Sequence, residues 1–255
     1  MSEISRNSIR LSLPPEPNLA WAYFLDVDGT LLEIADTPEK ACFDEAVLDL
    51  IEQVHRATGG AMALVSGRSI EDLDARIGKR YLSIAGQHGL ERRDACGRLR
   101  VYADSFHARP EMRMALDELL GNHPALLLED KGLTMALHYR QAPHLASHSL
   151  RIMTDIVARS NGKLALQHGK CVLEIRPAGF DKGVAVVEYL KEPPFAARRP
   201  VFIGDDRTDE HGFDVVDRVG GVSIKVGHGK TCARYRLPDV AAVRHWLSQM
   251  LGELK

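Results

Sequence analysis

Acidic side chains follow two short apolar runs of the sequence. Asp26 and Asp28 come directly after residues 21–25, and Asp205 comes directly after residues 201–204. A carboxylate in this position can attack phosphorus and form an aspartyl-phosphate, which divides one difficult displacement into two easier ones. Asp26 suits the nucleophile, and Asp28 suits a general acid and base that serves the leaving oxygen and then the attacking water. These acids therefore indicate phosphoryl transfer.

Carboxylates that surround a phosphate need cations to offset their charge. Mg²⁺ is a hard, octahedral ion that prefers such oxygens, and we expect it to bind the Asp26 carboxylate, the Asp28 carbonyl and Asp205. Ser66, after another apolar run, would donate a hydrogen bond to the phosphoryl group. Lys182 would neutralise charge in the transition state. The simpler interpretations are helix caps for the paired acids and a solvated loop lysine for Lys182.

The apolar runs that carry these residues alternate with helical patterns. Residues 43–56 have helical spacing and end at Gly59-Gly60, and Ser69 is the expected N-cap of the next helix, with Asp72 in the capping-box position. This alternation predicts right-handed βαβ units and a parallel sheet, with ligands beyond the carboxyl ends of its strands. Buried strands are predicted at residues 21–25, 61–65, 82–85, 201–204 and 222–226.

The pattern changes near Phe106. A helix followed by two strand-like runs occurs twice over residues 106–176, which predicts a small α+β unit with an antiparallel sheet. We interpret this unit as an insertion, because the βα alternation resumes after it. The chain would then consist of an N-terminal arm (1–20), a core (21–105 and 177–255) and the inserted unit. Prolines in the arm favour an extended conformation.

The composition argues against several classes of function. A net charge of −2 offers no basic surface, so nucleic acid is not an expected partner. The four cysteines are scattered, which favours free thiols in a reducing cytosol over disulfides or a zinc site. The sequence has neither the apolar core of a signal peptide nor a stretch that could span a bilayer. We expect a cytoplasmic monomer without a membrane partner.

Together these residues resemble the motifs of the haloacid dehalogenase (HAD) superfamily of phosphotransferases. Asp-x-Asp-Gly-Thr-Leu at 26–31 matches the first motif, and Ser66, Lys182 and Asp205 match the other three. The resemblance implies an α/β fold with a Rossmann-like parallel-sheet core. It also implies that the inserted α+β unit between Ser66 and Lys182 is a cap domain that determines substrate specificity.

Within this superfamily the chain is most similar to the trehalose-phosphatase family. The most specific segment is Gly204-Asp205-Asp206-Arg207-Thr208-Asp209-Glu210, which matches the pattern Gly-Asp-Asp-x-Thr-Asp-Glu. The resemblance implies a magnesium-dependent enzyme that hydrolyses trehalose 6-phosphate to trehalose and phosphate through Asp26. Further segments carry the similarity: Ser66-Gly67-Arg68, Gly86-Gln87-His88-Gly89-Leu90-Glu91, His138-Tyr139-Arg140 and Glu174-Ile175-Arg176-Pro177.

The resemblance also implies roles for residues outside the four motifs. Asp206 and Asp209 would be supporting acids near the metal. Gln87 departs mildly from the family pattern, which leaves the individual sugar contacts open. The simpler interpretations are a solvated strand face for Glu174 and a helix-start residue for Arg68. The implied substrate-binding residues are Arg68, His88, Arg140, Lys170 and Glu174.

Two alternatives to this function remain at the level of sequence. The first is a HAD phosphatase that acts on another sugar phosphate, such as sucrose 6-phosphate or mannosyl-phosphoglycerate. The second is a non-catalytic regulator that binds a sugar phosphate. A regulator could dispense with the catalytic groups, yet Asp26, Asp28, Lys182 and Asp205 are all present. The sequence therefore favours an enzyme.

Overall fold

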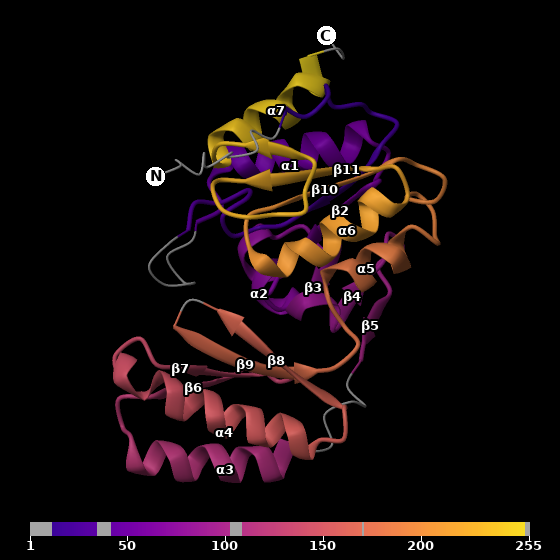
Figure 1. The fold of residues 1–255 in the computed structure, drawn as a ribbon. Coiled ribbons are helices and arrows are strands. Elements are labelled where there is room, and N and C mark those ends of the chain that lie inside the picture. The colour runs from indigo at the N-terminus through magenta and orange to yellow at the C-terminus, as the bar shows by residue number, and fades with distance from the viewer. Residues whose placement is uncertain (1–11, 35–41, 103–108, 170, 253–255) are drawn as a thin grey trace, which may run out of the picture. The chain divides into compact units, whose positions relative to one another are not determined.

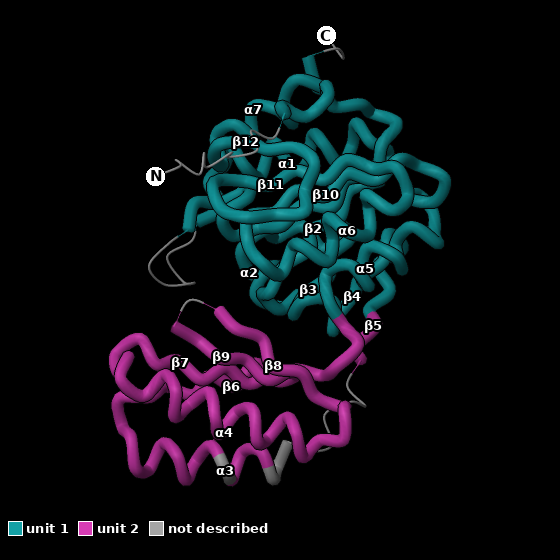
Figure 2. The backbone as a smooth tube through the Cα atoms, in the orientation of Figure 1, with its two compact units in different colours: residues 1–99, 181–255 teal, residues 100–180 magenta. Residues whose placement is uncertain are grey.

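A computed structural model describes residues 12–34, 42–102, 109–169 and 171–252 (Figure 1). The chain forms two compact units, one of Met1–Leu99 with Asp181–Lys255 and one of Arg100–Phe180 (Figure 2). The second unit is thus an insertion in the chain of the first. Its function as a cap stays a prediction.

The first unit is built on an eight-stranded sheet in the order β12-β11-β10-β1-β2-β3-β4-β5. Its centre consists of β10 (Pro200–Gly204), β1 (Ala22–Leu25), β2 (Met62–Val65) and β3 (Ser83–Gly86), all parallel. In the register of these strands, Leu25 lies between Ile203 and Leu64. The residues that follow β10, β1 and β2 therefore emerge at one edge of the sheet, which confirms the predicted parallel core.

Helices cover both faces of this sheet. Side chains alternate between the two faces along a strand, so Tyr23 and Leu25 pack in one apolar core and Ala22 and Phe24 in the other. Strand β1 is consequently buried on both faces, and its sequence is apolar throughout. The first core includes side chains of α1 (Glu45–Ala57), α2 (Ile70–Ile77) and α7 (Val240–Gly252), and the second those of α5 (Lys182–Tyr189) and α6 (Glu210–Arg218).

The sequence did not predict the strands at the two ends of the sheet. At one end these strands are β4 (Glu91–Arg93) and β5 (Leu99–Val101). At the other end it is β12 (Tyr235–Leu237), which pairs with the predicted strand β11 (Val222–Val226). In β4, Arg92 is only 2% exposed and ion-paired with Glu192, and Arg93 donates two hydrogen bonds of 2.8 Å to Asp74. Charged side chains are rarely buried unless they are paired. These partners lie far away in sequence, so the pattern of β4 does not indicate a buried strand.

The N-cap predicted at Ser69 is confirmed. The Ser69 hydroxyl accepts a 3.1 Å hydrogen bond from the Asp72 backbone N–H and begins α2. The Asp72 carboxylate, which we expected to complete a capping box, forms ion pairs with Arg68 and Arg76 at 2.9 Å. Helix α2 is therefore tied through Asp72 to the residue that follows the Ser66-Gly67 turn.

The second unit contains a four-stranded antiparallel sheet with two helices on one face (Figure 1). Its strand order is β6 (Leu127–Asp130), β7 (Met135–His138), β9 (Val172–Pro177) and β8 (Leu164–Gly169). Helices α3 (Arg109–Asn122) and α4 (Ala146–Arg159) contribute to its core with Leu116 and Met153. Helix, strand and strand thus occur twice, as the sequence predicted.

The described part of the N-terminal arm is attached to the first unit. Ser12 forms a parallel bridge with Tyr235 of β12, and the Trp246 indole donates a 2.9 Å hydrogen bond to the Pro15 carbonyl. The arm therefore contacts β12 at the end of the sheet and helix α7. Within the described ranges, no helix combines the length and the hydropathy that crossing a membrane requires.

Candidate active site

Asp26 lies directly after β1 and is 4% exposed. Its backbone N–H donates to the Ile203 carbonyl at 3.0 Å, which continues the pairing of β1 with β10. Its carboxylate accepts a 2.6 Å hydrogen bond from Lys182 Nζ on Oδ1 and a 3.3 Å hydrogen bond from the Thr30 hydroxyl on Oδ2. Both oxygens of the predicted nucleophile are thus held in place.

Lys182 is the first residue of α5 and is 3% exposed, so it is not a solvated loop lysine. Its ammonium donates 2.6 Å hydrogen bonds to Asp26 Oδ1 and to Asp209 Oδ1. Burial disfavours the charged form, but the Asp209 and Asp26 carboxylates outweigh burial and raise the pKa of Lys182. Lys182 is therefore a fixed positive charge beside Asp26.

Three carboxylates meet at the ends of β1 and β10. One oxygen each of Asp26, Asp205 and Asp209 lies within 4.8 Å of the others. Burial, followed by the negative charge of Asp209, raises the pKa of Asp26, and the same two causes raise the pKa of Asp205 to about 6. Lys182 does not fully offset this repulsion. The cluster therefore fits a divalent cation with oxygen ligands.

Gly29 allows the Asp26 turn to approach the second acidic loop. Its φ of +82° lies in the left-handed region, where glycine has no steric penalty. A Cβ atom on Gly29 would overlap the Asp205 carboxylate. Glycine is therefore required both by the turn and by the distance between the two acidic loops.

Asp206 and Asp209 shape the loop after β10. The short 3₁₀ helix Arg207–Asp209 has a capping box in which the Asp206 backbone N–H donates to Asp209 Oδ2 at 2.9 Å. Asp209 Oδ1 accepts from Lys182, so both oxygens of this buried carboxylate are engaged. Asp209 thus orients Lys182 and its own loop, which leaves Asp205 as the better placed carboxylate for a cation.

Lys225 is a buried lysine that the sequence did not single out. It lies in β11 opposite Gly204 and donates hydrogen bonds to the Asp205 carbonyl and, at 2.7 Å, to the Val226 carbonyl. Burial lowers its pKa. Lys225 therefore fixes the backbone that carries Asp205. Its position inside an apolar strand gives a weak signal that a search for buried polar residues could have found.

Ser66 and Arg68 form the third polar turn at this edge. Ser66 is buried after β2, and its hydroxyl accepts a 3.1 Å hydrogen bond from the Arg68 backbone N–H. The Arg68 guanidinium contacts Asp28 with two hydrogen bonds of 2.7 and 2.8 Å. Asp28 and Arg68, separated by 40 residues, are thus direct partners.

His88 is brought beside this turn by an unusual backbone. It lies in the 3₁₀ segment Gln87–Gly89 with a φ of +58°, and its N–H donates to the Ser66 carbonyl at 2.9 Å. A Cβ on Gly67 would be 2.9 Å from the His88 ring. Gln87, which departs mildly from the family pattern, donates a hydrogen bond to one oxygen of Glu91. The other Glu91 oxygen accepts from the Ile70 N–H at the start of α2. Gln87 therefore braces this turn.

The remaining predicted residues belong to the second unit. Glu174, in β9, is 7% exposed, so its strand face is not simply solvated. Lys131 Nζ lies 3.5 Å from its carboxylate, and Gln167 of β8 lies opposite it in the register. Arg140 is exposed in the turn after β7, and Lys170 lies outside the described residues. The sequence did not indicate Lys131 and Gln167, because neither belongs to a motif that resembles the family.

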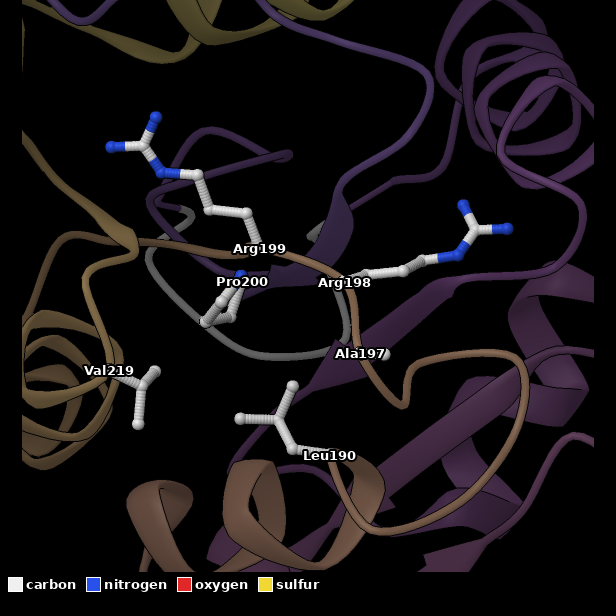
Figure 3. Close-up of a pocket in the computed structure, with 6 residues that line it drawn as sticks. All are labelled: Leu190, Ala197, Arg198, Arg199, Pro200 and Val219. Atoms are coloured by element: carbon white, nitrogen blue, oxygen red, sulfur yellow. The ribbon is translucent and has the colours of Figure 1, made fainter.

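Cavities elsewhere in the first unit do not coincide with these acids. A cavity of about 410 Å³ lies at the opposite end of β10, where Pro200 begins the strand (Figure 3). Both of its arginines donate hydrogen bonds to backbone carbonyls, Arg198 to that of Leu19 and Arg199 to that of Gly220. The candidate active site is therefore defined by the chemistry of the strand ends.

Comparisons with known proteins agree with this geometry. The family model described as trehalose-phosphatase matches residues 24–241. The trehalose-6-phosphate phosphatase of Escherichia coli K12 is 40% identical over 245 residues, covering 96% of this chain and 92% of the relative. A probable trehalose-phosphate phosphatase of Sinorhizobium fredii is 41% identical and covers 81% of this chain and 78% of the relative.

Solved structures show the same fold. The C-terminal domain of Candida albicans trehalose-6-phosphate phosphatase superposes with a TM-score of 0.79 at 20% identity, covering 94% of this chain and 99% of the other. A trehalose-6-phosphate phosphatase related protein gives a TM-score of 0.76 at 26% identity, with 91% and 99% covered. The fold is thus shared along nearly the whole length of the chain.

Proposed function

The chain belongs to the trehalose-phosphatase family, and we propose that this phosphoric monoester hydrolase cleaves trehalose 6-phosphate through a phospho-aspartate on Asp26. The observation that carries the mechanism is the buried contact of Asp26 with Lys182, beside Asp205 and Asp209. A carboxylate whose position is fixed and whose charge is only partly offset suits attack on phosphorus.

In the first step, an Asp26 carboxylate oxygen forms a bond to phosphorus, and the bond from phosphorus to the sugar oxygen breaks. Asp28 gives its proton to that oxygen, so trehalose leaves as an alcohol. Asp28 suits this role because its side chain is 39% exposed, whereas Asp26 is buried. Lys182, with the Ser66 hydroxyl, stabilises the charge on the phosphoryl oxygens.

In the second step, a water molecule attacks the phosphorus of the aspartyl-phosphate. Asp28, now a carboxylate, takes a proton from this water, and the bond between phosphorus and Asp26 breaks. Phosphate leaves, and both carboxyl groups return to their starting states. The same pair of acids therefore serves both steps, and Lys182 keeps the regenerated Asp26 carboxylate in position.

The acidic cluster fits a divalent cation, and we propose Mg²⁺. The Asp26 and Asp205 carboxylates and the Asp28 carbonyl would hold it, and Asp206, Asp209 and Lys225 would support the loop that carries Asp205. When bound, the ion would offset the charge of the phosphoryl group and the surrounding carboxylates. Mg²⁺ keeps an octahedral oxygen shell, which agrees with a donor set of oxygen atoms alone.

Removal of the metal is expected to stop turnover. After chelation, phosphate release should fall by at least about 100-fold and recover with Mg²⁺, because the carboxylate cluster then repels the phosphate. Asp205→Asn should also weaken Mn²⁺ binding, measured directly by electron paramagnetic resonance, by at least about tenfold. Asp217→Asn, a change outside the cluster, is the control. Full activity in chelator would contradict the metal assignment.

We propose that the second unit is the specificity cap and that the face of its sheet opposite its two helices (Figure 1) binds sugar hydroxyls. This face carries Glu174, Lys131 and Gln167, and Ala136 lies between Glu129 and Glu174 in the register of the sheet. Charged and amide groups of this kind bind hydroxyls through directional hydrogen bonds. Arg140, Lys170 and His88 stay predictions as sugar contacts. The monomeric state, the cytoplasmic location and the exclusion of nucleic acid also stay predictions.

A panel of sugar phosphates tests the substrate. We expect kcat/KM for trehalose 6-phosphate to exceed that for glucose 6-phosphate, sucrose 6-phosphate and mannosyl-phosphoglycerate by at least about 100-fold, because unpaired polar groups reject a substrate that lacks their partners. Glu174→Gln should reduce this preference, and Glu118→Gln on α3 is a matched control on a helix of the same unit. Equal turnover of glucose 6-phosphate would contradict the substrate, but not the phosphoryl chemistry.

A further inference from the structure

Arg68, a largely buried side chain, forms an ion pair with the carboxylate of Asp28. We propose that Arg68 is a positioning residue that orients Asp28 for proton transfer and does not bind the sugar phosphate. This inference rests on the proposed function, in which Asp28 moves the proton in both steps. It assigns to Arg68 a role different from the substrate contact that the family resemblance implied.

The contact between the two side chains is a bidentate ion pair. Arg68 Nε donates to Asp28 Oδ2 at 2.7 Å, and Nη2 donates to Oδ1 at 2.8 Å. Two parallel hydrogen bonds between planar groups fix the plane of the carboxylate as well as its distance. A lysine ammonium is a point charge and lacks this fork of two parallel N–H donors. The geometry therefore determines the orientation of Asp28 and not only its charge.

The exposure of the two side chains leaves the reactive side of Asp28 open. The Asp28 side chain is 39% exposed, and the Arg68 side chain is 9% exposed. The fork occupies one direction at each carboxylate oxygen, and each oxygen has a second lone pair. Asp28 can thus exchange a proton with a substrate or a water on its exposed side while Arg68 stays bound behind it.

Arg68 itself is held by the start of helix α2. Its third nitrogen, Nη1, donates to Asp72 Oδ2 at 2.9 Å, so all three guanidinium nitrogens donate to carboxylates. Asp72 also accepts from Arg76 Nε at 2.9 Å, and its backbone N–H is bound by Ser69. Three of the five guanidinium N–H groups thus donate to carboxylates, on a side chain that is only 9% exposed. The arrangement therefore favours a fixed support over a substrate ligand.

A double-mutant cycle on trehalose 6-phosphate at saturating Mg²⁺ tests this role. Asp28→Asn should lower kcat by about 10²–10⁴-fold, the usual effect of losing a general acid and base. Arg68→Ala should lower kcat by about 10–100-fold with KM changed less than about threefold, because misplacement by about 1 Å has an effect of that size. The double variant should have a kcat less than about threefold below that of Asp28→Asn alone, because Arg68 acts through Asp28.

Two variants separate positioning from loss of stability. Arg93→Ala removes another bidentate pair, with Asp74 of the same helix, and the Arg93 side chain is 8% exposed. It should lower the melting temperature and leave kcat per folded molecule unchanged. Arg68→Lys keeps the charge without the fork and should recover at most about a tenth of the lost kcat. If Arg68→Ala fails to fold, Asp72→Asn replaces it in the double-mutant cycle with Asp28→Asn, because it weakens the ion pair that holds Arg68.

The outcomes distinguish this inference from the proposed function. Independent, additive effects of Arg68→Ala and Asp28→Asn would overturn positioning, as would a rise of KM by about tenfold or more with kcat unchanged, which is the result for a substrate ligand. Full kcat in Arg68→Ala with impaired Asp28→Asn would also overturn it and leave the proposed function intact. Full kcat in Asp28→Asn would instead contradict the proton-transfer role of Asp28.

Discussion

Replacing Asp26 by Asn is expected to lower kcat for trehalose 6-phosphate by at least about 10⁴-fold, because an amide cannot form the phospho-enzyme and uncatalysed hydrolysis of a phosphate monoester is extremely slow. Single-turnover phosphate release from purified variant and wild-type protein measures this loss. Labelled phosphate should be trapped on acid-quenched wild-type protein and be absent from the variant.

The Asp26→Asn variant should keep its fold and its ligand. Lys182 retains Asp209 as a partner, and the Asn oxygen can still accept a hydrogen bond from the ammonium. Because burial and the charge of Asp209 raise the pKa of Asp26 in the metal-free protein, its neutral replacement should not lower the melting temperature. Substrate binding by calorimetry should persist. Turnover within tenfold of wild type would rule out Asp26 as the nucleophile.

Replacing Lys182 by Met is expected to impair both activity and stability. The change leaves the Asp26 and Asp209 carboxylates buried together without their shared cation, which costs about 3–5 kcal/mol of unfolding free energy. Loss of the ammonium should lower kcat by about 10²–10³-fold, as for other groups that stabilise transition-state charge. Urea unfolding of the metal-free protein and phosphate release with Mg²⁺ measure the two effects.

A second substitution separates these effects. Asp209→Asn added to Lys182→Met removes one of the two unpaired carboxylates, so the unfolding free energy should recover in part. The kcat should stay low, because the charge beside the phosphoryl group is still missing. Recovery of both quantities would mean that Lys182 has only a structural role. A Lys182→Met protein as stable as wild type would contradict the buried ion pairs.

The polar residues at the strand ends follow from local patterns in the sequence. Asp26, Ser66 and Asp205 each follow a short apolar run, and in a parallel sheet such positions meet at one edge for any order of the central strands. The alternation of helices and strands, and its interruption near Phe106, are local patterns that also specified the inserted α+β unit. The fold class and the meeting of these polar residues at one edge could therefore be predicted without knowledge of any side-chain partner.

The partners of these side chains depend on the tertiary structure. Arg68 contacts Asp28, Lys182 joins Asp26 to Asp209, and Lys131 meets Glu174 across strands that are distant in sequence. Hydrophobic periodicity records which face of an element is buried, but not which residue of another element lies opposite. Pairing across the fold depends on strand order and register, and these follow from packing of the whole core. For that reason the ion pair of Arg68 with Asp28 could not be predicted from the sequence.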